Sequence, residues 1–161
     1  YKCLNFPLKW KLEKVLMSNI DAADTVVFKK DRKWYMLSNI CSSSIGEHHS
    51  ELHLFESDNL IKNIWNKSYS NPVVFNSKKA RNGGFFSLGT NLYRVNQVQL
   101  KDKYGYSLKI NKIQSINKNL YIENEISDIK PTFFKSLIGT HHFHMNDEYT
   151  VIDHCKISRK N

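Results

Sequence analysis

The sequence has few of the residues that form disulfide bonds or structural metal sites. Its three cysteines are Cys3, Cys41 and Cys155, and no CxxC pair occurs among them. Three widely spaced cysteines exclude a disulfide framework, and their odd number is typical of a protein from a reducing compartment. Only three prolines and no low-complexity tract are present, which argues against a disordered chain. We therefore expect a packed fold with no cofactor and no metal centre.

Long hydrophobic runs are also missing. No stretch approaches 18 apolar residues, so the sequence predicts no transmembrane segment. The start, from Tyr1, has no charged region followed by an apolar one, so we read no signal peptide. We expect a cytoplasmic location or one at the cytoplasmic face of a membrane. The absence of an initial Met suggests a piece of a longer protein.

Positive charge is abundant but dispersed. The 24 basic and 15 acidic residues give a formal net charge of +9. The densest clusters, Lys29–Lys33 and Lys78–Arg81, lack the density of a nucleic-acid-binding arm, and no DNA- or RNA-binding motif occurs. We expect no nucleic-acid partner. A positive surface instead favours phosphorylated or acidic glycans, or an anionic membrane face.

Short apolar runs broken by turn residues are the main structural signal. Residues 24–28 and 34–37 flank a polar turn and predict a β-hairpin, and residues 83–86 and 92–95 flank a second turn. Residues 51–55 read as another strand. The Lys11–Leu16 segment fits either a short helix or an edge strand. These patterns predict an all-β fold.

The hairpins recur along the chain. Phe86 and Tyr93 follow Phe28 and Tyr35 by the same 58 residues, and a third copy covers 141–152. Repeats of all-β units at such a period point to the blades of a propeller, which must stack to bury their apolar faces. Three units are too few to close a ring. We therefore predict one domain over residues 1–161, a partial, about three-bladed portion of a five-bladed β-propeller built from antiparallel sheets.

Several motifs occur in an order that carries a family resemblance. They are DTVVFKKDRKWYML from Asp24, SELHLFESDNL from Ser50, NPVV from Asn71, ARNGGFF from Ala80, LYRVNQ from Leu92, YGYSLKINKI from Tyr104, YIENE from Tyr121 and GTHHFH from Gly139. With these, the chain resembles the N-terminal propeller domain of glucosamine inositolphosphorylceramide transferases and of bacterial sugar-modifying proteins. More distantly, it is similar to the five-bladed furanosidase superfamily.

The resemblance implies a five-bladed propeller that works in glycan or glycolipid assembly beside a separate sugar-transfer domain. The furanosidases need an axial set of carboxylates. Asp24 stands where a blade's acidic residue is expected, but the next repeat has Arg81-Asn82 there. This departure argues against hydrolysis.

Three carboxylates are candidates for a glycosidase-like mechanism: Asp24, Glu51 and Glu123. Inverting glycosidases use two carboxyls about 6.5–9.5 Å apart with unequal pKa values. The competing interpretation is that each carboxylate pairs with a basic residue or closes a turn.

Arg81, Arg94 and Gln97 are candidates for binding a sugar hydroxyl, carboxylate or phosphate, because arginine binds planar acceptors bidentately. Arg81 could instead hold a carboxylate between blades, such as Glu123. The glycines at 83 and 84 leave room beside Arg81 for a ligand to approach the backbone.

His141, His142 and His144 form the densest titratable cluster. In a strand, His142 and His144 would share one face. With Asp153 or His154 they could hold a zinc-like ion, but no metal-ligand spacing is met. Sugar contact and structural hydrogen bonding are the other interpretations. Among the aromatic residues, most of which we assign to the core, Trp65 is the best candidate for stacking on a sugar.

The sequence thus favours a carbohydrate-associated module that binds or presents a sugar, a sugar nucleotide or a glycolipid head group to a separate catalytic domain or chain. A glycosidase-like hydrolase is the alternative.

Overall fold

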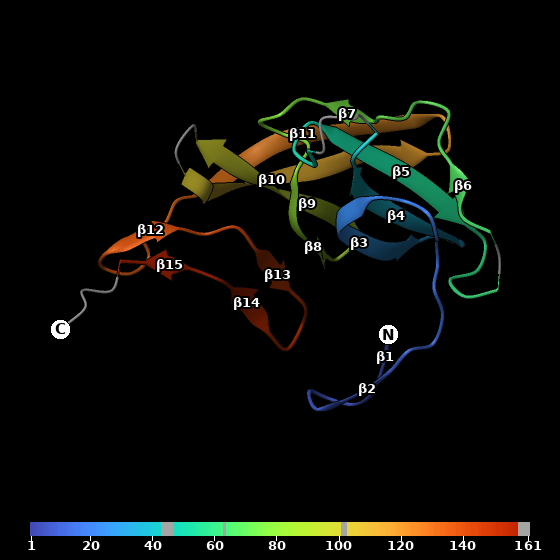
Figure 1. The fold of residues 1–161 in the computed structure, drawn as a ribbon, viewed down its shortest axis with the longest axis horizontal. Helices are drawn as coiled ribbons and strands as arrows, with labels where there is room; N and C mark the ends of the chain where they lie inside the picture. The colour runs from blue at the N-terminus through green and yellow to red at the C-terminus, as the bar shows by residue number, and fades with distance from the viewer. Residues whose placement is uncertain (43–46, 63, 101–102, 158–161) are drawn as a thin grey trace.

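The structure, a computed structural model, describes residues 1–42, 47–62, 64–100 and 103–157. All of its regular elements are β-strands (Figure 1). They are β1 (Lys2–Asn5), β2 (Lys9–Lys11), β3 (Ala22–Lys30), β4 (Lys33–Ile40), β5 (Glu51–Ser57), β6 (Asn66–Lys67), β7 (Val74–Phe75), β8 (Asn82–Leu88), β9 (Asn91–Leu100), β10 (Lys103–Asn117), β11 (Leu120–Ile129), β12 (Leu137–Gly139), β13 (Phe143–Met145), β14 (Thr150–Ile152) and β15 (Cys155–Lys156). No helix in these ranges is long and apolar enough to cross a membrane.

Sheet one is built from β3 to β7. Its strands follow the order β3-β4-β5-β6, and β7 pairs with the opposite end of β5. The β3–β4 hairpin turns tightly between Lys30 and Lys33, where Asp31 takes a positive φ of 55°. A short polar side chain tolerates that conformation, so the turn chemistry agrees with the predicted hairpin.

Sheet two is a four-stranded antiparallel meander in the order β8-β9-β10-β11. Gly89, with φ of 56°, lies in the two-residue turn that joins Leu88 to Asn91. The hairpin predicted around this turn is confirmed. In both sheets the aromatic residues of the repeat form the same cross-strand pair, Phe28 with Tyr35 and Phe86 with Tyr93.

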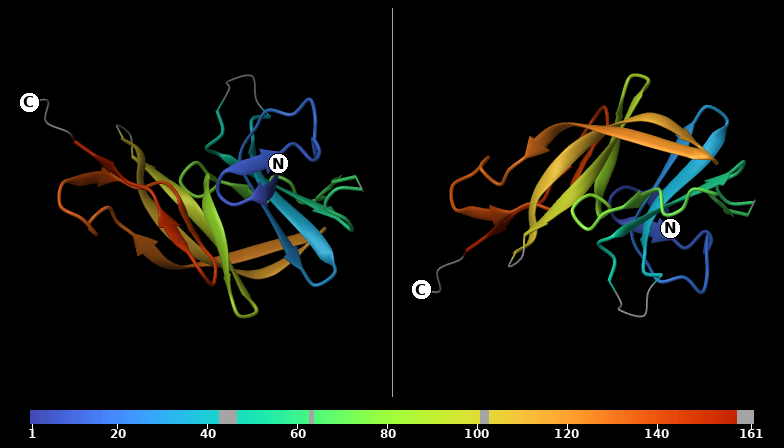
Figure 2. Two further views of the ribbon diagram at one scale, coloured as in Figure 1. Left: turned by 90° about the horizontal axis from the view of Figure 1, so that it is seen from below. Right: turned by 90° about the horizontal axis from the view of Figure 1, so that it is seen from above.

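The C-terminal strands form a third, smaller unit. β13 pairs with β14, and β12 pairs with β15, so residues 137–156 make an interrupted hairpin. Sheet two lies between sheet one and this unit (Figures 1 and 2). Sheet two contacts both of its neighbours: β8 contacts β3 of sheet one and β13 of the third unit, and β10 contacts β12.

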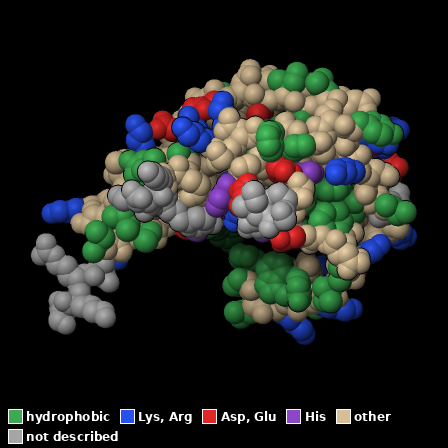
Figure 3. All heavy atoms as spheres, turned by 45° about the horizontal axis from the view of Figure 1, so that its top comes forward, with side chains coloured by type: hydrophobic (Ala, Val, Ile, Leu, Met, Phe, Trp, Pro, Cys, Tyr) green, Lys and Arg blue, Asp and Glu red, His purple; other side chains and the backbone are tan. Residues whose placement is uncertain are grey.

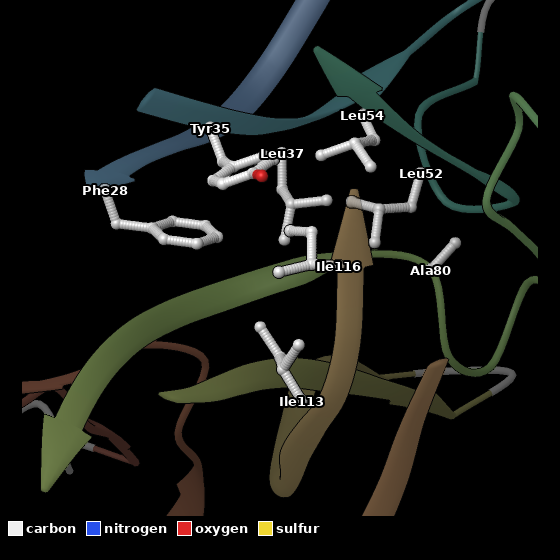
Figure 4. Packing of buried hydrophobic residues seen from close by; sticks show 8 residues of the cluster. All are labelled: Phe28, Tyr35, Leu37, Leu52, Leu54, Ala80, Ile113 and Ile116. Atoms are coloured by element: carbon white, nitrogen blue, oxygen red, sulfur yellow. The ribbon is translucent and has the colours of Figure 1, made fainter. Parts of the chain in front are cut away.

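The largest core lies between sheets one and two. Phe28, Tyr35, Leu37, Leu52 and Leu54 from sheet one face Ile113 and Ile116 of β10 (Figure 4). Each such side chain contributes about 1.5–3 kcal/mol when it is fully buried. A second cluster, of Phe86, Val95 and Leu108 with Phe143 and Met145, joins sheet two to the third unit.

The other face of sheet one is covered by the N-terminal segment. Met36, Ile40, Phe55 and Trp65 pack there with Leu16, Met17 and Ile20. The Lys11–Leu16 segment, for which the sequence left helix and edge strand open, is neither: only Lys11 belongs to β2, and the rest has no regular structure.

The all-β class and the antiparallel sheets are confirmed, and the described residues form no closed propeller.

Candidate functional site

A pocket of about 430 Å³ opens where the starts of β3 and β8 meet the residues just before β13 and just after β14. Its lining residues come from all three units: Asp24, Thr25, Val26, Asn82, Gly84, Gln97, His141, His142 and Asp153. Four of the predicted site residues, Asp24, Gln97, His141 and His142, are therefore brought together, although they are spread over more than 110 positions of the chain.

Asp24 is presented to this pocket by an irregularity in β3. The β3–β4 register shifts between Ala23 and Val26, and Asp24 has a φ of 48°. A left-handed residue within a strand is uncommon and marks a bulge that redirects a side chain. The Asp24 carboxylate pairs with Arg81 and also accepts a 3.2 Å hydrogen bond from Gln97 Nε2. Arg81 therefore holds a carboxylate of the neighbouring sheet, which is one of the two interpretations of this residue, but the carboxylate is that of Asp24 and not that of Glu123.

Gln97 and Asn82 tie the start of sheet two to sheet one. Gln97 Nε2 donates to the Asn82 carbonyl at 2.7 Å, and Asn82 Nδ2 donates to the Asp24 carbonyl at 2.9 Å. On the other side, the Asn39 side chain donates to the Ala80 carbonyl and accepts from the Asn82 amide at 2.8 Å. All these amides are buried, so the pocket floor is preorganised by satisfied hydrogen bonds.

Asp153 organises the third side of the pocket. Its Oδ1 accepts hydrogen bonds of 2.8 Å from the backbone amides of both His141 and His142, and its Oδ2 contacts His141 Nδ1. Burial raises the pKa of Asp153, but these hydrogen bonds lower the pKa by more than burial raises it, so the net shift is downward. Asp153 therefore stays ionised at neutral pH.

His142 faces the pocket as a neutral group. Partial burial lowers its pKa below the usual range and outweighs the opposing effect of Asp153. A neutral imidazole has one donor and one acceptor nitrogen, a combination that suits a sugar hydroxyl.

His142 and His144 do not share a strand face, as they would if both lay in one strand. β13 begins only at Phe143, because the amides of His141 and His142 bond to the Asp153 carboxylate in place of a neighbouring strand. His144 lies in β13, is exposed, and does not line the pocket. Within the described ranges, no group of three His, Cys, Asp or Glu side chains is placed to hold a metal ion.

The glycines of β8 lie against the backbone of β13 and of the residues before it, at the place where the sequence suggested that a ligand would approach. Gly84 has a φ of 138°, and a Cβ built there would lie 1.8 Å from the Phe143 carbonyl oxygen. Gly83 faces the His141 carbonyl in the same way, at 2.9 Å. Close backbone approach is the correct interpretation of these glycines, but their neighbour is β13 and the residues before it.

Arg94 and Glu123 form a buried ion pair away from the pocket. Arg94 is fully buried between the sheets and donates from Nε and Nη2 to the two Glu123 oxygens at 2.8 and 2.5 Å. It also donates to the Lys79 carbonyl at 2.9 Å, and Tyr121 donates to Glu123 at 2.6 Å. Burial lowers the pKa of Arg94, but the Glu123 carboxylate reverses this and raises it overall. Because the guanidinium and the carboxylate both have hydrogen-bond partners, we assign the pair a structural role.

Glu51 also lies outside the pocket. It begins β5 and accepts hydrogen bonds of 2.7 Å from Ser42 and 2.8 Å from His53 Nε2. The Ser42 and His53 bonds lower the pKa of Glu51. Neither Glu51 nor Glu123 faces Asp24 across the pocket, so the three candidate carboxylates do not form one set.

Trp65 is buried, with 7% of its surface exposed, and packs against Met36 and Phe55. Its ring is therefore part of the core and is not presented to a ligand in this structure.

Asn82 and Asp153 line the pocket but were not selected as ligand-binding candidates, and Asp153 was considered only as a partner for a zinc-like ion. Asn82 follows Asp24 by 58 residues, so the repeat that aligned Phe28 with Phe86 could have identified it. Asp153 could not have been assigned its role, because its partners are backbone amides, which leave no mark in the sequence.

Comparison with known proteins supports the family resemblance. The family model described as "Glucosamine inositolphosphorylceramide transferase 1, N-terminal" matches residues 1–148. The chain is 32% identical over 130 residues to glucosamine inositolphosphorylceramide transferase 1 of Arabidopsis thaliana, covering 78% of this chain and 16% of that protein. It is 31% identical over 126 residues to the protein of that name from Oryza sativa subsp. japonica, covering 76% of this chain and 16% of the relative.

No solved structure matches the chain. The chain spans about one sixth of the length of these relatives, so it corresponds to one part of a larger transferase. A family model that matches residues 1–148 nevertheless covers most of the sequence. The chain belongs to the family of glucosamine inositolphosphorylceramide transferase N-terminal domains.

Proposed function

We propose that this chain is a carbohydrate-binding module that holds a sugar or a glycolipid head group for a separate sugar-transfer domain. The observation that carries the proposal is the polar pocket at the junction of the three units. Its amide, carboxylate and neutral imidazole groups offer both donors and acceptors, which is the chemistry that sugar hydroxyls require. The name of the relatives supports a glucosamine- or inositol-containing ligand.

The architecture we propose is a portion of a five-bladed propeller related to the furanosidase superfamily, with the pocket on its axis. Sheets one and two and the third unit would be successive blades. The proposed setting is glycan or glycolipid assembly at the cytoplasmic side of a membrane, where a catalytic domain or chain acts on the bound sugar.

The glycosidase alternative is weaker, because it needs a protonated carboxylic acid facing a second carboxylate. The pocket has two carboxylates, Asp24 and Asp153. Asp24 is paired with Arg81, and Asp153 accepts two backbone hydrogen bonds and has a lowered pKa. Asp153 is therefore unsuited to be a general acid at neutral pH, and the Asp24 carboxylate is already engaged by Arg81.

Isothermal titration of the chain with glucosamine and with a soluble glycosyl inositol phosphate tests the proposal. We expect saturable binding that His142→Ala weakens by about tenfold, the effect of losing one or two hydrogen bonds. His144→Ala is a matched control, because His144 is exposed on the same unit and does not line the pocket.

Equal losses in the two histidine variants, or no binding by the folded wild-type chain, would refute the pocket as the binding site. Release of free sugar from a glycoside, abolished by Asp24→Asn, would establish the hydrolase alternative instead.

A further inference from the structure

The β1–β2 hairpin leaves an unusual number of apolar side chains in solvent. Within residues 1–15, the large hydrophobic side chains that are at least half exposed are Tyr1, Leu4, Phe6, Leu8, Trp10, Leu12 and Val15. Leu8 is 87% exposed and Phe6 67%, and both lie in the turn that joins the strands. The Phe6 ring lies 6.1 Å from the ring of Tyr149, which is itself exposed and extends the apolar group onto the third unit. Single exposed hydrophobic residues are ordinary, but a contiguous group on a projecting element marks an interaction surface.

Lysines are concentrated on the same hairpin. Lys2 pairs directly with Lys11 across the strands, and Lys9 lies two residues from Lys11 on the same face. None of the three makes an ion pair with a described residue. Like charges placed opposite each other destabilise a two-stranded hairpin unless an anion compensates them. The arrangement therefore calls for a negatively charged partner.

The apolar and basic groups are arranged in layers along the hairpin. The turn, Phe6-Pro7-Leu8, carries no charge, and Lys9 and Lys11 follow directly behind it. Trp10 lies between them on the opposite face, with its indole N–H donating to the Pro7 carbonyl at 2.8 Å. Figure 3 shows hydrophobic and basic side chains together on the projecting lobe at the lower centre, the position of the hairpin in Figure 1.

We propose that the β1–β2 hairpin docks, turn first, on an anionic lipid surface. An apolar tip with tryptophan behind it suits the boundary between acyl chains and head groups, and lysines at that depth contact anionic head groups. A protein groove would satisfy the apolar tip, but it would need several acidic groups to match the lysine face. The inference is independent of sugar binding in the pocket, which involves no residue of the hairpin.

Sedimentation of the 161-residue chain with vesicles of phosphatidylcholine and phosphatidylserine (70:30) tests this proposal. We expect binding that is strong at low salt and weak with pure phosphatidylcholine. Lys9→Glu/Lys11→Glu should reduce partitioning by at least about 30-fold, because each lysine near the surface contributes about fivefold. Phe6→Ser/Leu8→Ser should reduce it by a similar factor through lost insertion.

Matched controls are available on the opposite side of the molecule. Phe75 in β7 is 73% exposed, and Lys78 and Lys79 are exposed nearby. Phe75→Ser and Lys78→Glu/Lys79→Glu should bind vesicles as the wild type does. All the altered side chains are exposed, so the thermal midpoint should stay the same and the comparison does not depend on folding.

Three outcomes would overturn the proposal: no vesicle binding by the wild type, equal losses in the hairpin and control variants, or a wild-type dimer in light scattering that Phe6→Ser/Leu8→Ser converts to monomer. The last would identify the hairpin as a contact between copies of the chain. A failure of sugar binding alone would leave the hairpin proposal unaffected.

Discussion

Sheets one and two are copies of the same repeat, but they differ in the residues outside its aromatic pair. The aromatic pair is retained, with Phe28 and Tyr35 in sheet one matching Phe86 and Tyr93 in sheet two, and the rings lie 5.9 Å and 4.9 Å apart. The polar positions diverge. Asp24 corresponds to Asn82 and Met36 to Arg94, each 58 residues apart. The comparison indicates that the aromatic pairs set the fold of a unit, whereas the remaining positions adapt it to its neighbours.

The largest effect on stability should come from replacing Arg94 of sheet two by methionine, the residue that sheet one has at the equivalent position, Met36. Arg94→Met leaves the Glu123 carboxylate buried without its partner, which should cost about 3–5 kcal/mol in the free energy of unfolding. Urea denaturation measures this cost. The double variant Arg94→Met/Glu123→Leu should recover most of it.

Met36→Leu is the control in sheet one, where an apolar replacement of similar volume should cost less than about 1.5 kcal/mol. If Arg94→Met lowered the free energy of unfolding as little as Met36→Leu does, the ion pair would not have the structural role that we assign to it.

The second effect concerns the contact of sheet two with the third unit. Gly84 takes the place that Val26 has in sheet one, and its Cβ position is occupied by the Phe143 carbonyl. Gly84→Ala should therefore destabilise the chain by more than about 2 kcal/mol and expose the amides of β13 to hydrogen exchange.

Gly89→Ala provides the matched comparison. Gly89 also has a positive φ, of 56°, but nothing lies within 4 Å of its Cβ position. The cost should be limited to about 1 kcal/mol from the backbone conformation. Equal costs at the two glycines would argue against close packing of β8 on β13.

The third effect tests the difference between Asp24 and Asn82 directly. Asp24→Asn gives both sheets the same residue and removes a charged acceptor from the pocket. Sugar affinity should fall by about 10- to 100-fold, as expected when a hydrogen bond to a charged group is lost. Stability should change by less than about 1 kcal/mol, because Asp24 is partly exposed. Unchanged affinity in a calorimetric titration would remove Asp24 from the binding site.

The smallest effect is on pH dependence. The pKa of Asp153 is lowered in the folded state, so the unfolded chain binds more protons as the pH falls through the usual aspartate value near 3.8. The stability that Asp153 provides is therefore present above that pH and is lost below it as the pH approaches the folded pKa. Asp153→Asn should remove this loss, which we expect to be less than about 1 kcal/mol in the free energy of unfolding. An unchanged dependence of stability on pH in this variant would contradict the assigned hydrogen bonds.

The hairpins and the repeat could be predicted because they depend on local turn chemistry and on the spacing of aromatic residues. Asp31 and Gly89 lie in the turns where the pattern placed them, and the Phe and Tyr pairs have the predicted offset. Pairing between units could not be predicted. It depends on which sheet face meets which neighbour, and this decides that Arg94 rather than Arg81 reaches Glu123.

The site was predictable only in part, for the same reason. Asp24, Gln97, His141 and His142 are polar residues within or next to predicted strands, which the sequence reveals, and the structure places them around one pocket. Glu51 and Trp65 have similar sequence surroundings, but Glu51 closes a local hydrogen-bond network and Trp65 fills a core. Burial and partner choice arise from the packing of whole sheets, and no local pattern encodes them.

The most direct test of the binding site is to map amide chemical shifts of the chain during titration with a soluble glycosyl inositol phosphate. We expect saturable shifts that cluster at Asp24, Asn82, Gln97 and His142, which come from all three units. Shifts confined to the surroundings of Glu51 or Glu123, or none up to saturating ligand, would contradict the claim that the junction of the three units is the binding site.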